Sequence, residues 1–553
     1  MIGSGYSRLL GTVGAVCVLG LLAGGAAVTA QQPSNTITFQ DLLQGLKDPT
    51  RWLTFSGDYS GQRHSPLTQI TPENVKHLSP QWTFQTDTPG KFEATPIVLD
   101  GVLYVTGANN LAWALDARTG RTIWRYRRDL PDGVVVCCGR VNRGFGILGD
   151  TLYMATLDAH LLAMDRKTGA IVWDAVLGDY KAAYSSTSAP LVVKDKVLIG
   201  MGGGEYGVRG FIDAYDAKTG KRAWRFHTIP APGEPGNDSW SKDNDSWATG
   251  GGATWQIGSY DPELNLVIWG TGNAGPQMYG GDRPGDNLYA ASFVALDADT
   301  GKVRWHFQFT PHDVWDYDAT HVPVLADIML NGQRRKVVLN ANRNGFFYVL
   351  DRETGKMLLG KPFANTTWAK EIGADGRPKV LPNTIPTEKG ALVCPAAAGA
   401  TNFMTPSYDP KLGLLFITAR EGCMTFYAWK VDYVAGDSFR GGAGVASEPA
   451  GGTYGALRAI DPTTGAQRWE FRYTSPTSAG VTSTASGLVF TGDNEGNFIA
   501  FDGRTGKSLW HYQTGSGIYA SATTYMLDGK QHIVMPSGAT LTAFALPDAD
   551  VQR

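Results

Sequence analysis

One short pattern recurs along the chain and restricts the folds open to it: Asp, two residues, Thr-Gly, three residues and an aromatic side chain. Six copies end in Trp, at residues 116–124, 165–173, 216–224, 297–305, 461–469 and 502–510. A seventh, at residues 351–359, keeps the turn but ends in Leu359. Because Asp caps a turn, Thr adds a hydroxyl bond and Gly accepts positive φ, each copy predicts a β-hairpin whose Trp returns to the core.

The spacing of the copies predicts a closed set of sheets. Where no wide gap intervenes they lie about forty to fifty residues apart, which is typical of propeller blades rather than solenoid turns. Apolar or alternating runs precede most copies, such as residues 101–107, and these supply further strands. Trp82 is interpreted as an eighth repeat without its turn. The chain is therefore predicted to be all-β, an eight-bladed β-propeller with tryptophan repeats. Its wide gaps, 216–297 and 351–461, hold long insertions, where sites are often built.

Length and charge are consistent with this closed architecture and argue against some partners. At ~150 residues per domain the chain would form about three or four domains, but a closed repeat absorbs the same length as one. The formal net charge is −2, so no global field favours nucleic acid or an anionic membrane surface. We therefore expect no nucleic-acid partner.

The first thirty residues are predicted to be an export signal. Arg8 precedes an apolar stretch at 9–28, and residues 28–30 form a small-residue cleavage site. A retained membrane anchor is the alternative, and Cys17 lacks the preceding residue that a lipoprotein signal needs. Cleavage leaves residues 31–553 as one propeller domain in the periplasm or outside the cell. No other stretch is long and apolar enough to span a bilayer.

Four cysteines remain after cleavage, Cys137, Cys138, Cys394 and Cys423, and an even number in an oxidising compartment predicts disulfides. Neighbouring residues have Cα atoms ~3.8 Å apart, below the usual disulfide span of ~4.4 Å and above. On residues alone, free thiols and long-range bridges therefore stay open for Cys137 and Cys138. The sequence contains no C-x-x-C-H, so no c-type haem site is expected in it.

The repeat resembles the tryptophan-docking motif of the pyrroloquinoline quinone (PQQ) dehydrogenase superfamily, which non-enzymatic propellers of outer-membrane assembly share. Further motifs, from Trp52 to the C-terminus, resemble those of the PQQ-dependent alcohol dehydrogenases of the methanol and ethanol dehydrogenase type. The clearest are CC-x-x-VNRG from Cys137, GGGATWQIGSYDP around Trp255 and PHDVWDYD around Asp316. The resemblance implies bound PQQ, a metal ion and the oxidation of an alcohol.

The resemblance also implies a PQQ pocket with two flat faces. A disulfide between Cys137 and Cys138 would cover one face, and the Trp255 indole would stack on the other. An aromatic wall suits a planar ligand, although a buried structural Trp is the alternative for Trp255. Arg143 would bind a PQQ carboxylate. The remaining implied PQQ contacts are Glu93, Thr187, Arg343 and Asn402, and Cys394 with Cys423 would form the family's second disulfide.

Three residues match the family's metal positions: Glu205, Asn273 and Asp316. Carboxylate and amide oxygens suit a hard cation, and no His or Cys joins them. Asp318 follows two residues after Asp316 and is expected to share its face in an extended segment. Calcium-type methanol dehydrogenases carry a small residue there and lanthanide-dependent ones an Asp, so the resemblance favours a lanthanide(III) ion over Ca²⁺. A solvated loop acid or a salt-bridge partner is the alternative for Asp318.

The sequence departs from the family's pattern at two residues and in one interval. Gly202 and Ala253 replace hydroxyl residues that touch PQQ in the methanol enzymes, and no Trp lies between Trp469 and Trp510, where methanol dehydrogenase has one. These departures bear on the substrate and the pocket size rather than on the cofactor.

The matches together predict a periplasmic quinoprotein dehydrogenase that oxidises a small primary alcohol to an aldehyde. Asp316 is expected to take the hydroxyl proton, kept ionised by the nearby cation, while Arg343 donates to the quinone oxygens. Electrons are expected to pass to a separate soluble cytochrome c, and a homodimer is compatible with the resemblance. A sugar or polyol dehydrogenase, or a cofactor-free scaffold for protein partners, is the alternative function.

Overall fold

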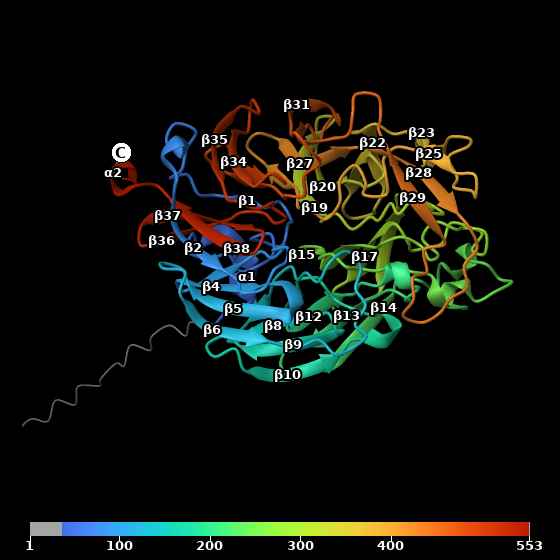
Figure 1. Cartoon of the computed structure of the whole chain (residues 1–553), viewed down its shortest axis with the longest axis horizontal. Coiled ribbons are helices and arrows are strands. Elements are labelled where there is room, and N and C mark those ends of the chain that lie inside the picture. The colour runs from blue at the N-terminus through green and yellow to red at the C-terminus, as the bar shows by residue number, and fades with distance from the viewer. Residues whose placement is uncertain (1–35, 552–553) are drawn as a thin grey trace, which may run out of the picture. The chain divides into compact units, whose positions relative to one another are not determined.

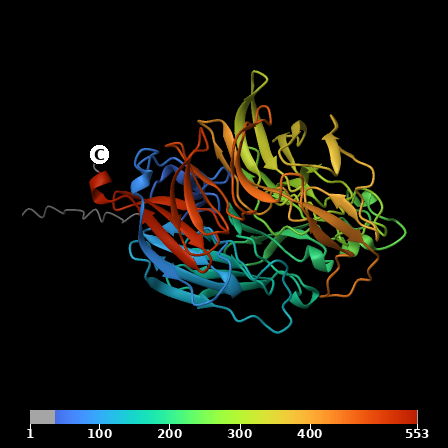
Figure 2. The same cartoon turned by 45° about the horizontal axis from the view of Figure 1, so that its top comes forward.

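The computed structural model describes residues 36–551, so the predicted export signal, Cys17 and the expected cleavage site lie outside the described residues. Residues 37–551 consist mainly of short antiparallel strands and the loops that join them. In Figures 1 and 2 these strands form sheets that follow one another in chain order, from blue through green and orange to red. The all-β prediction is confirmed.

One five-stranded and seven four-stranded sheets form the blades. Their strands are β2 (Ser79–Gln85) with β36 (Thr523–Leu527), β37 (Lys530–Ser537) and β38 (Thr540–Ala545); β3 (Ile97–Leu99), β4 (Val102–Thr106), β5 (Leu111–Asp116) and β6 (Thr122–Arg127); β7 (Gly146–Leu148), β8 (Thr151–Ala155), β9 (His160–Asp165) and β10 (Ile171–Val176); β11 (Leu191–Val193), β12 (Lys196–Gly200), β13 (Phe211–Asp216) and β14 (Arg222–His227); β15 (Ser259–Asp261), β16 (Leu266–Gly270), β17 (Ser292–Asp297) and β18 (Val303–Gln308); β19 (Val324–Leu330), β20 (Gln333–Ala341), β21 (Phe346–Asp351) and β22 (Met357–Pro362); β26 (Ser407–Asp409), β27 (Leu414–Glu421), β30 (Tyr454–Ile460) and β31 (Gln467–Arg472); and β32 (Thr482–Thr484), β33 (Leu488–Gly492), β34 (Asn497–Asp502) and β35 (Ser508–Gln513), to which β1 (His64–Ser65) adds a parallel fifth strand.

Both predicted insertions are present, and each contains helices or strands that do not belong to the blade sheets. The gap 216–297 holds two 3-10 helices, η6 (Asn237–Ser239) and η7 (Ser246–Thr249). The gap 351–461 holds two small sheets, one of β23 (Ala369–Ile372) and β24 (Pro378–Val380) and one of β25 (Ala391–Val393), β28 (Cys423–Ala428) and β29 (Gly442–Ser447). The other helices are α1 (Phe39–Gln44), α2 (Asp548–Val551), η1 (Gly45–Lys47), η2 (Val75–His77), η3 (Ala108–Asn110), η4 (Tyr180–Ala182) and η5 (Gly204–Tyr206).

One sheet is shared by the two ends of the described chain. Strand β2 pairs antiparallel with β38, from Ser79 opposite Ala545 to Gln85 opposite Thr540. Trp82 lies on β2, and the other three strands of its sheet come from residues 523–545. The interpretation of Trp82 as an eighth repeat without its turn is therefore confirmed. The turn is missing because β2 and β38 are neighbours in space but not in sequence.

The geometry that the turns share follows from their Asp, Thr and Gly residues. Asp116 Oδ1 accepts hydrogen bonds from the backbone N–H and the hydroxyl of Thr119, both at 2.9 Å. Gly120 follows with φ of 70°, a left-handed conformation that costs a residue with a side chain about 1–2 kcal/mol. The same Asp–Thr bonds recur in five of the six other copies of the turn, and in the copy at 461–469 Asp461 Oδ1 accepts from Thr463 instead.

The repeat Trp side chains return toward the core, as expected, and most of them also join neighbouring blades. Trp124 Nε1 donates to the carbonyl of Arg166 in the next blade at 2.9 Å, and its ring packs on the next turn at Gly169. The other Nε1 donors and carbonyl acceptors are Trp82 and Ala117 (3.0 Å), Trp173 and Ala217 (3.1 Å), Trp224 and Ala298 (3.3 Å), Trp305 and Arg352 (3.1 Å), and Trp469 and Gly503 (2.9 Å). Leu359, which replaces Trp in one copy, lies against Gly465 in the same way.

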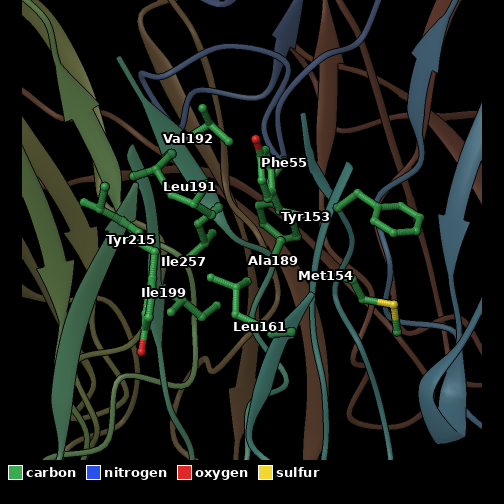
Figure 3. Packing of buried hydrophobic residues seen from close by; sticks show 14 of the residues in the cluster. Phe55, Tyr153, Met154, Leu161, Ala189, Leu191, Val192, Ile199, Tyr215 and Ile257 are labelled. Atoms are coloured by element: carbon green, nitrogen blue, oxygen red, sulfur yellow. The ribbon is translucent and has the colours of Figure 1, made fainter. Parts of the chain in front are cut away.

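The hydrophobic core fills the spaces between adjacent sheets. Leu161 on β9 and Ile199 on β12 belong to one buried cluster that joins two neighbouring blades (Figure 3). Strands buried on both faces explain the continuous apolar runs seen in the sequence. Within residues 36–551, no helix has the length and apolar character to cross a membrane.

The contact between Trp and the next turn makes a testable contribution to stability. A Cβ at Gly355 would lie 2.5 Å from the Trp305 ring, and φ there is 71°. We expect Gly355→Ala to lower the free energy of unfolding by about 2–5 kcal/mol, from overpacking and left-handed strain together. Gly529 is the matched control, because its φ is 80° and nothing lies within 4 Å of its Cβ position. Gly529→Ala should cost only the strain, about 1–2 kcal/mol; equal losses in thermal unfolding would contradict the docking role.

Candidate active site

The site lies where corresponding loops of the blades meet at one end of the sheets. The first two strands of each blade are antiparallel, so the start of the first strand and the end of the second lie at the same end. Glu93, Arg143 and Thr187 precede the first strands β3, β7 and β11. Glu205 and Arg343 follow the second strands β12 and β20. The fold thus brings residues far apart in sequence to one place.

These loops enclose a cavity of about 270 Å³. Eleven of the residues predicted for the cofactor and the metal line it: Glu93, Cys137, Cys138, Arg143, Thr187, Glu205, Trp255, Asp316, Asp318, Arg343 and Asn402. Asn273 lies behind the wall and is buried. The volume is near the lower end of the range for small-molecule sites.

Both predicted disulfides are present. Cys137 is bonded to its neighbour Cys138, in a loop between β6 and β7, and the pair forms part of the cavity wall. Cys394 is bonded to Cys423, the first residue of β28. The second bond lies outside the cavity and joins the residue after β25 to the start of β28 in the same small sheet.

Arg143 is held by two residues that were predicted with it. Its Nη2 donates to Glu93 Oε2 at 2.7 Å and its Nη1 to the Thr187 hydroxyl at 2.7 Å. Burial lowers the pKa of Arg143 and raises the pKa of Glu93, and the charge of each partner opposes both shifts. The guanidinium carbon also lies 5.1 Å from the centre of the Trp255 ring. Arg143 is therefore fixed beside the aromatic wall before any ligand binds.

Two aspartates and one arginine form the opposite wall. Arg343 pairs with Asp316 Oδ2 at 2.7 Å and with Asp318 Oδ2 at 2.9 Å. Asp316 has φ of 67°, so the segment is not regularly extended, and the expected reason for a shared face was wrong. The two carboxylates are nevertheless brought together, because both reach the same guanidinium.

Asp318 connects this wall to the indole and to Asn273. Its Oδ2 accepts a hydrogen bond from Trp255 Nε1 at 2.8 Å, and its Oδ1 accepts one from the backbone N–H of Asn273 at 2.6 Å. The Asn273 side-chain oxygen faces Gly204, whose Cβ position lies 3.2 Å away. Asn273 therefore lies beside the 3-10 helix η5 that carries Glu205.

The carboxylates of the cavity carry more negative charge than the neighbouring guanidinium balances. Burial raises the pKa of Asp316 well above its ordinary value; Arg343 opposes this, while Asp318 and Glu205 raise it further. Burial, followed by the charge of Asp318, also raises the pKa of Glu205. In the protein alone the pKa of Asp316 is thus raised, whereas a nearby cation is expected to lower it.

A metal ion fits this set of donors. The Oδ1 atom of Asp316 is buried and has no hydrogen-bond partner among the described residues. The free acceptors are carboxylate and amide oxygens, as a hard cation requires. The sulfur atoms of Cys137 and Cys138 lie within 4.8 Å of a Glu205 oxygen, but they are bonded to each other and are not thiolate ligands. A flat ligand fits too, because the disulfide and the indole both face one cavity.

Comparisons with known proteins agree with this geometry. Residues 52–362 match a family model described as the PQQ-containing glucose/ethanol/alcohol dehydrogenase β-propeller domain, and residues 453–552 match one described as outer membrane protein assembly factor BamB. The chain is 38% identical to quinoprotein alcohol dehydrogenase PedH of Pseudomonas putida, over 94% of this chain and 90% of that one. The chain belongs to the PQQ-dependent quinoprotein alcohol dehydrogenase family.

Solved structures of quinoprotein relatives have the same fold. A quinohemoprotein alcohol dehydrogenase from Comamonas testosteroni is 34% identical, with a TM-score of 0.88 over 93% of this chain and 83% of that one. A europium-containing methanol dehydrogenase is 32% identical, with a TM-score of 0.87 over 92% of this chain and 100% of that one. The predicted propeller fold is confirmed.

Several residues of the quinoprotein's cavity were not predicted. They are Lys91, Val141, Ser185, Phe403, Arg420 and Ser478. Lys91 and Phe403 lie close in sequence to predicted residues, which was the available signal. Ser185 lies 3.1 Å from the Cβ position of Gly202, so its hydroxyl stands beside the place where the methanol enzymes are expected to carry one. Ser478 lies in the interval that lacks a Trp, and nothing in the sequence marked it.

The buried Glu93–Arg143 pair allows a prediction about the cofactor-free quinoprotein. Removing one partner leaves an uncompensated buried charge, so we expect Glu93→Ala to lower the free energy of unfolding by about 3–5 kcal/mol. The double variant Glu93→Ala/Arg143→Met should recover part of that loss, because no charge is left unpaired. Chemical unfolding of the wild type, both single variants and the double variant gives the coupling energy. A double variant as unstable as the sum of the single variants would contradict the pairing.

Proposed function

We propose that this quinoprotein is an exported dehydrogenase that oxidises small primary alcohols to aldehydes with PQQ and a lanthanide ion. The observation that carries the proposal is the cluster of Glu205, Asp316 and Asp318 in the wall of a cavity that also contains the Cys137–Cys138 bond and Trp255. A propeller that only binds protein partners requires neither the acid cluster nor the neighbouring disulfide.

The proposed cofactor residues would hold a planar acid on several sides. Trp255 and the disulfide offer the two flat surfaces, Arg143 and Thr187 offer donors for a carboxylate, and Asn402 offers an amide. Glu205, Asn273, Asp316 and Asp318 are the proposed metal ligands. When bound, PQQ supplies the two-electron acceptor for the alcohol, and the metal ion supplies a Lewis acid.

Asp316 is the proposed base for the alcohol hydroxyl. Its Oδ1 lacks a partner, while its Oδ2 is held by Arg343 at 2.7 Å. The arginine thus orients one oxygen and leaves the other to accept a proton. Because burial raises the pKa of Asp316, its ionised form depends on the positive charges beside it, and a cation in the cluster would add to that of Arg343.

The choice of a lanthanide rests on charge. Three carboxylates close together suit a trivalent ion better than Ca²⁺, because each carboxylate that the ion neutralises no longer repels its neighbours. The likeness to a europium-containing methanol dehydrogenase, over nearly the whole chain, supports this choice.

The proposed location and electron acceptor rest on the sequence. The predicted export signal supports a location in the periplasm or outside the cell. A separate cytochrome c is the proposed electron acceptor.

Reconstitution tests the proposal directly. Protein freed of metal by chelation is mixed with PQQ and either LaCl₃ or CaCl₂, and alcohol-dependent reduction of an artificial dye is measured with primary alcohols, secondary alcohols and sugars. The proposal requires dye reduction that depends on PQQ and metal, greatest with lanthanum and a primary alcohol. Protein that takes up no PQQ under either condition would refute it.

The proton-acceptor role predicts the effect of removing Asp316. Asp316→Ala should lower kcat by about 10²–10⁴-fold or more, because general-base catalysis contributes about that much, while PQQ still binds. The exposed Asp375, which accepts a hydrogen bond from the backbone of Arg377, provides the control Asp375→Ala with wild-type turnover. Full activity of Asp316→Ala would exclude the role.

Metal selectivity gives a separate prediction for Asp318. Asp318→Ala should lose lanthanum-supported turnover, because the ligand set loses one negative charge. Since Asp318 also accepts from Trp255 and Asn273, Asp318→Asn is measured beside it, as a variant that keeps oxygen and shape but not charge. Lanthanum dependence that is unchanged in both variants, determined by kinetic titration of each metal, would rule out the assignment.

A further inference from the structure

Arg420 lies in the cavity wall but has no acidic partner. It is near the end of β27 in the seventh blade, where its Nε donates to the carbonyl of Thr477 at 2.9 Å and its Nη2 to the hydroxyl of Ser478 at 2.7 Å. No carboxylate of the described residues contributes to its electrostatic surroundings. Its Nη1 makes no hydrogen bond to the described residues, so that edge of the guanidinium remains available to a ligand.

Arg420 lies at the same end of its blade as residues already placed in the site. Glu205, Asn273 and Arg343 follow the ends of the second strands β12, β16 and β20. Strand β27 is the second strand of its own sheet, and Arg420 lies at its end. The backbone N–H of Arg420 also donates to Ala400 at 2.7 Å, close to Asn402. The repeat architecture therefore directs Arg420 toward the same ligand.

The other arginines of the cavity are already neutralised. Arg143 pairs with Glu93, and Arg343 pairs with both Asp316 and Asp318. Lys91 is exposed at the cavity and lies 4.9 Å from the Tyr519 ring. Arg420 is thus a half-buried cation of this cavity for which the described residues provide no carboxylate.

Keeping the Arg420 guanidinium charged without a counter-ion costs free energy in the protein alone. Burial and the charge of Arg343 lower the pKa of Arg420 to about 10. A guanidinium fixed by two hydrogen bonds and lacking a counter-ion is suited to take a planar anion from the cavity, because its fork matches a carboxylate. A small alcohol carries no such group, whereas PQQ is a tricarboxylic acid.

We propose that Arg420, oriented by Ser478 and Thr477, binds a carboxylate of PQQ as a second arginine beside Arg143. This inference rests on the proposed function. It assigns a cofactor-binding role to a residue that the sequence motifs did not indicate.

The test measures cofactor affinity rather than turnover. Wild-type protein freed of PQQ and supplied with lanthanum is titrated with PQQ, and the quenching of tryptophan fluorescence gives Kd. Arg420→Gln should weaken binding about ten- to a hundredfold, the loss expected for a charge-assisted hydrogen bond. Arg420→Lys should recover part of the affinity, because it restores the charge but not the fork. A Kd of Arg420→Gln within about twofold of the wild type would overturn the inference.

A matched variant and a modified cofactor complete the design. Arg472, on β31 of the same blade, is exposed and pairs with Glu470, so Arg472→Gln should bind PQQ like the wild type. With PQQ trimethyl ester, which has no carboxylate charge, the difference between wild type and Arg420→Gln should disappear. A difference as large as with PQQ itself would show that Arg420 does not act through a carboxylate.

Stability separates this role from a structural one. Arg420→Gln removes a half-buried charge that has no carboxylate partner among the described residues, so the thermal midpoint of the cofactor-free protein should not fall, while the rise caused by PQQ should shrink. A lower midpoint without PQQ, together with an unchanged PQQ-induced rise, would assign Arg420 to the fold and overturn the inference. Failure of the wild type to bind PQQ would instead refute the proposed function, and this inference with it.

Discussion

The contact between a repeat Trp and the turn of the next blade, made by six of these Trp residues, is the interaction on which the site depends. The residues that line the cavity come from several sheets, so a shift of one blade against its neighbour would separate residues that must act together. A ring packed on a turn glycine, with its Nε1 donating to a backbone carbonyl, restrains both distance and rotation. Pairing of β2 with β38 then fixes the sheet that contains both ends of the described chain. Small errors in position matter at a site of this kind, because binding and catalysis depend on geometry held to fractions of an ångström.

The fold uses corresponding loops of several blades to gather charges that would be unfavourable alone. Asp316 and Asp318 lie in the loop before β19 and Arg343 follows its partner strand β20, so one blade supplies this trio, whereas Glu93, Arg143 and Glu205 come from loops of other blades. Burial then strengthens every interaction in the cavity, including repulsion. The result is a cavity with an excess of negative charge at Glu205 and Asp316 and a guanidinium, at Arg420, without a carboxylate partner among the described residues. A trivalent cation and an acidic cofactor would compensate these two features separately.

The parts of the structure that could be predicted from sequence are those fixed by local chemistry. Asp, Thr and Gly determine each turn within five residues. The hairpins and the number of blades could therefore be predicted, including the blade that contains Trp82. The acceptor of each Trp Nε1 lies in the next blade, 34 to 74 residues away in the sequence, and periodicity does not reveal it. Asp316 and Asp318 were predicted to share a face because the segment was expected to be extended. Asp316 instead has a left-handed φ, which the spacing of the two residues does not reveal. Arg420 escaped notice because the lack of an acidic partner is a property of three-dimensional surroundings only.

The hydrogen bonds of Asp318 limit how the acid cluster can accept a cation. A carboxylate offers about four lone-pair sites, and Trp255, Arg343 and Asn273 already take three of those on Asp318. Asp316 retains an oxygen without a partner, and Glu205 lies beside them on η5. A cation would therefore find its least engaged oxygens on Asp316 and Glu205, with a single remaining site on Asp318. In this arrangement the charge of Asp318 strengthens the cluster while its hydrogen bonds hold the Trp255 indole in place. Metal affinity and the position of the aromatic wall are thus coupled through one side chain.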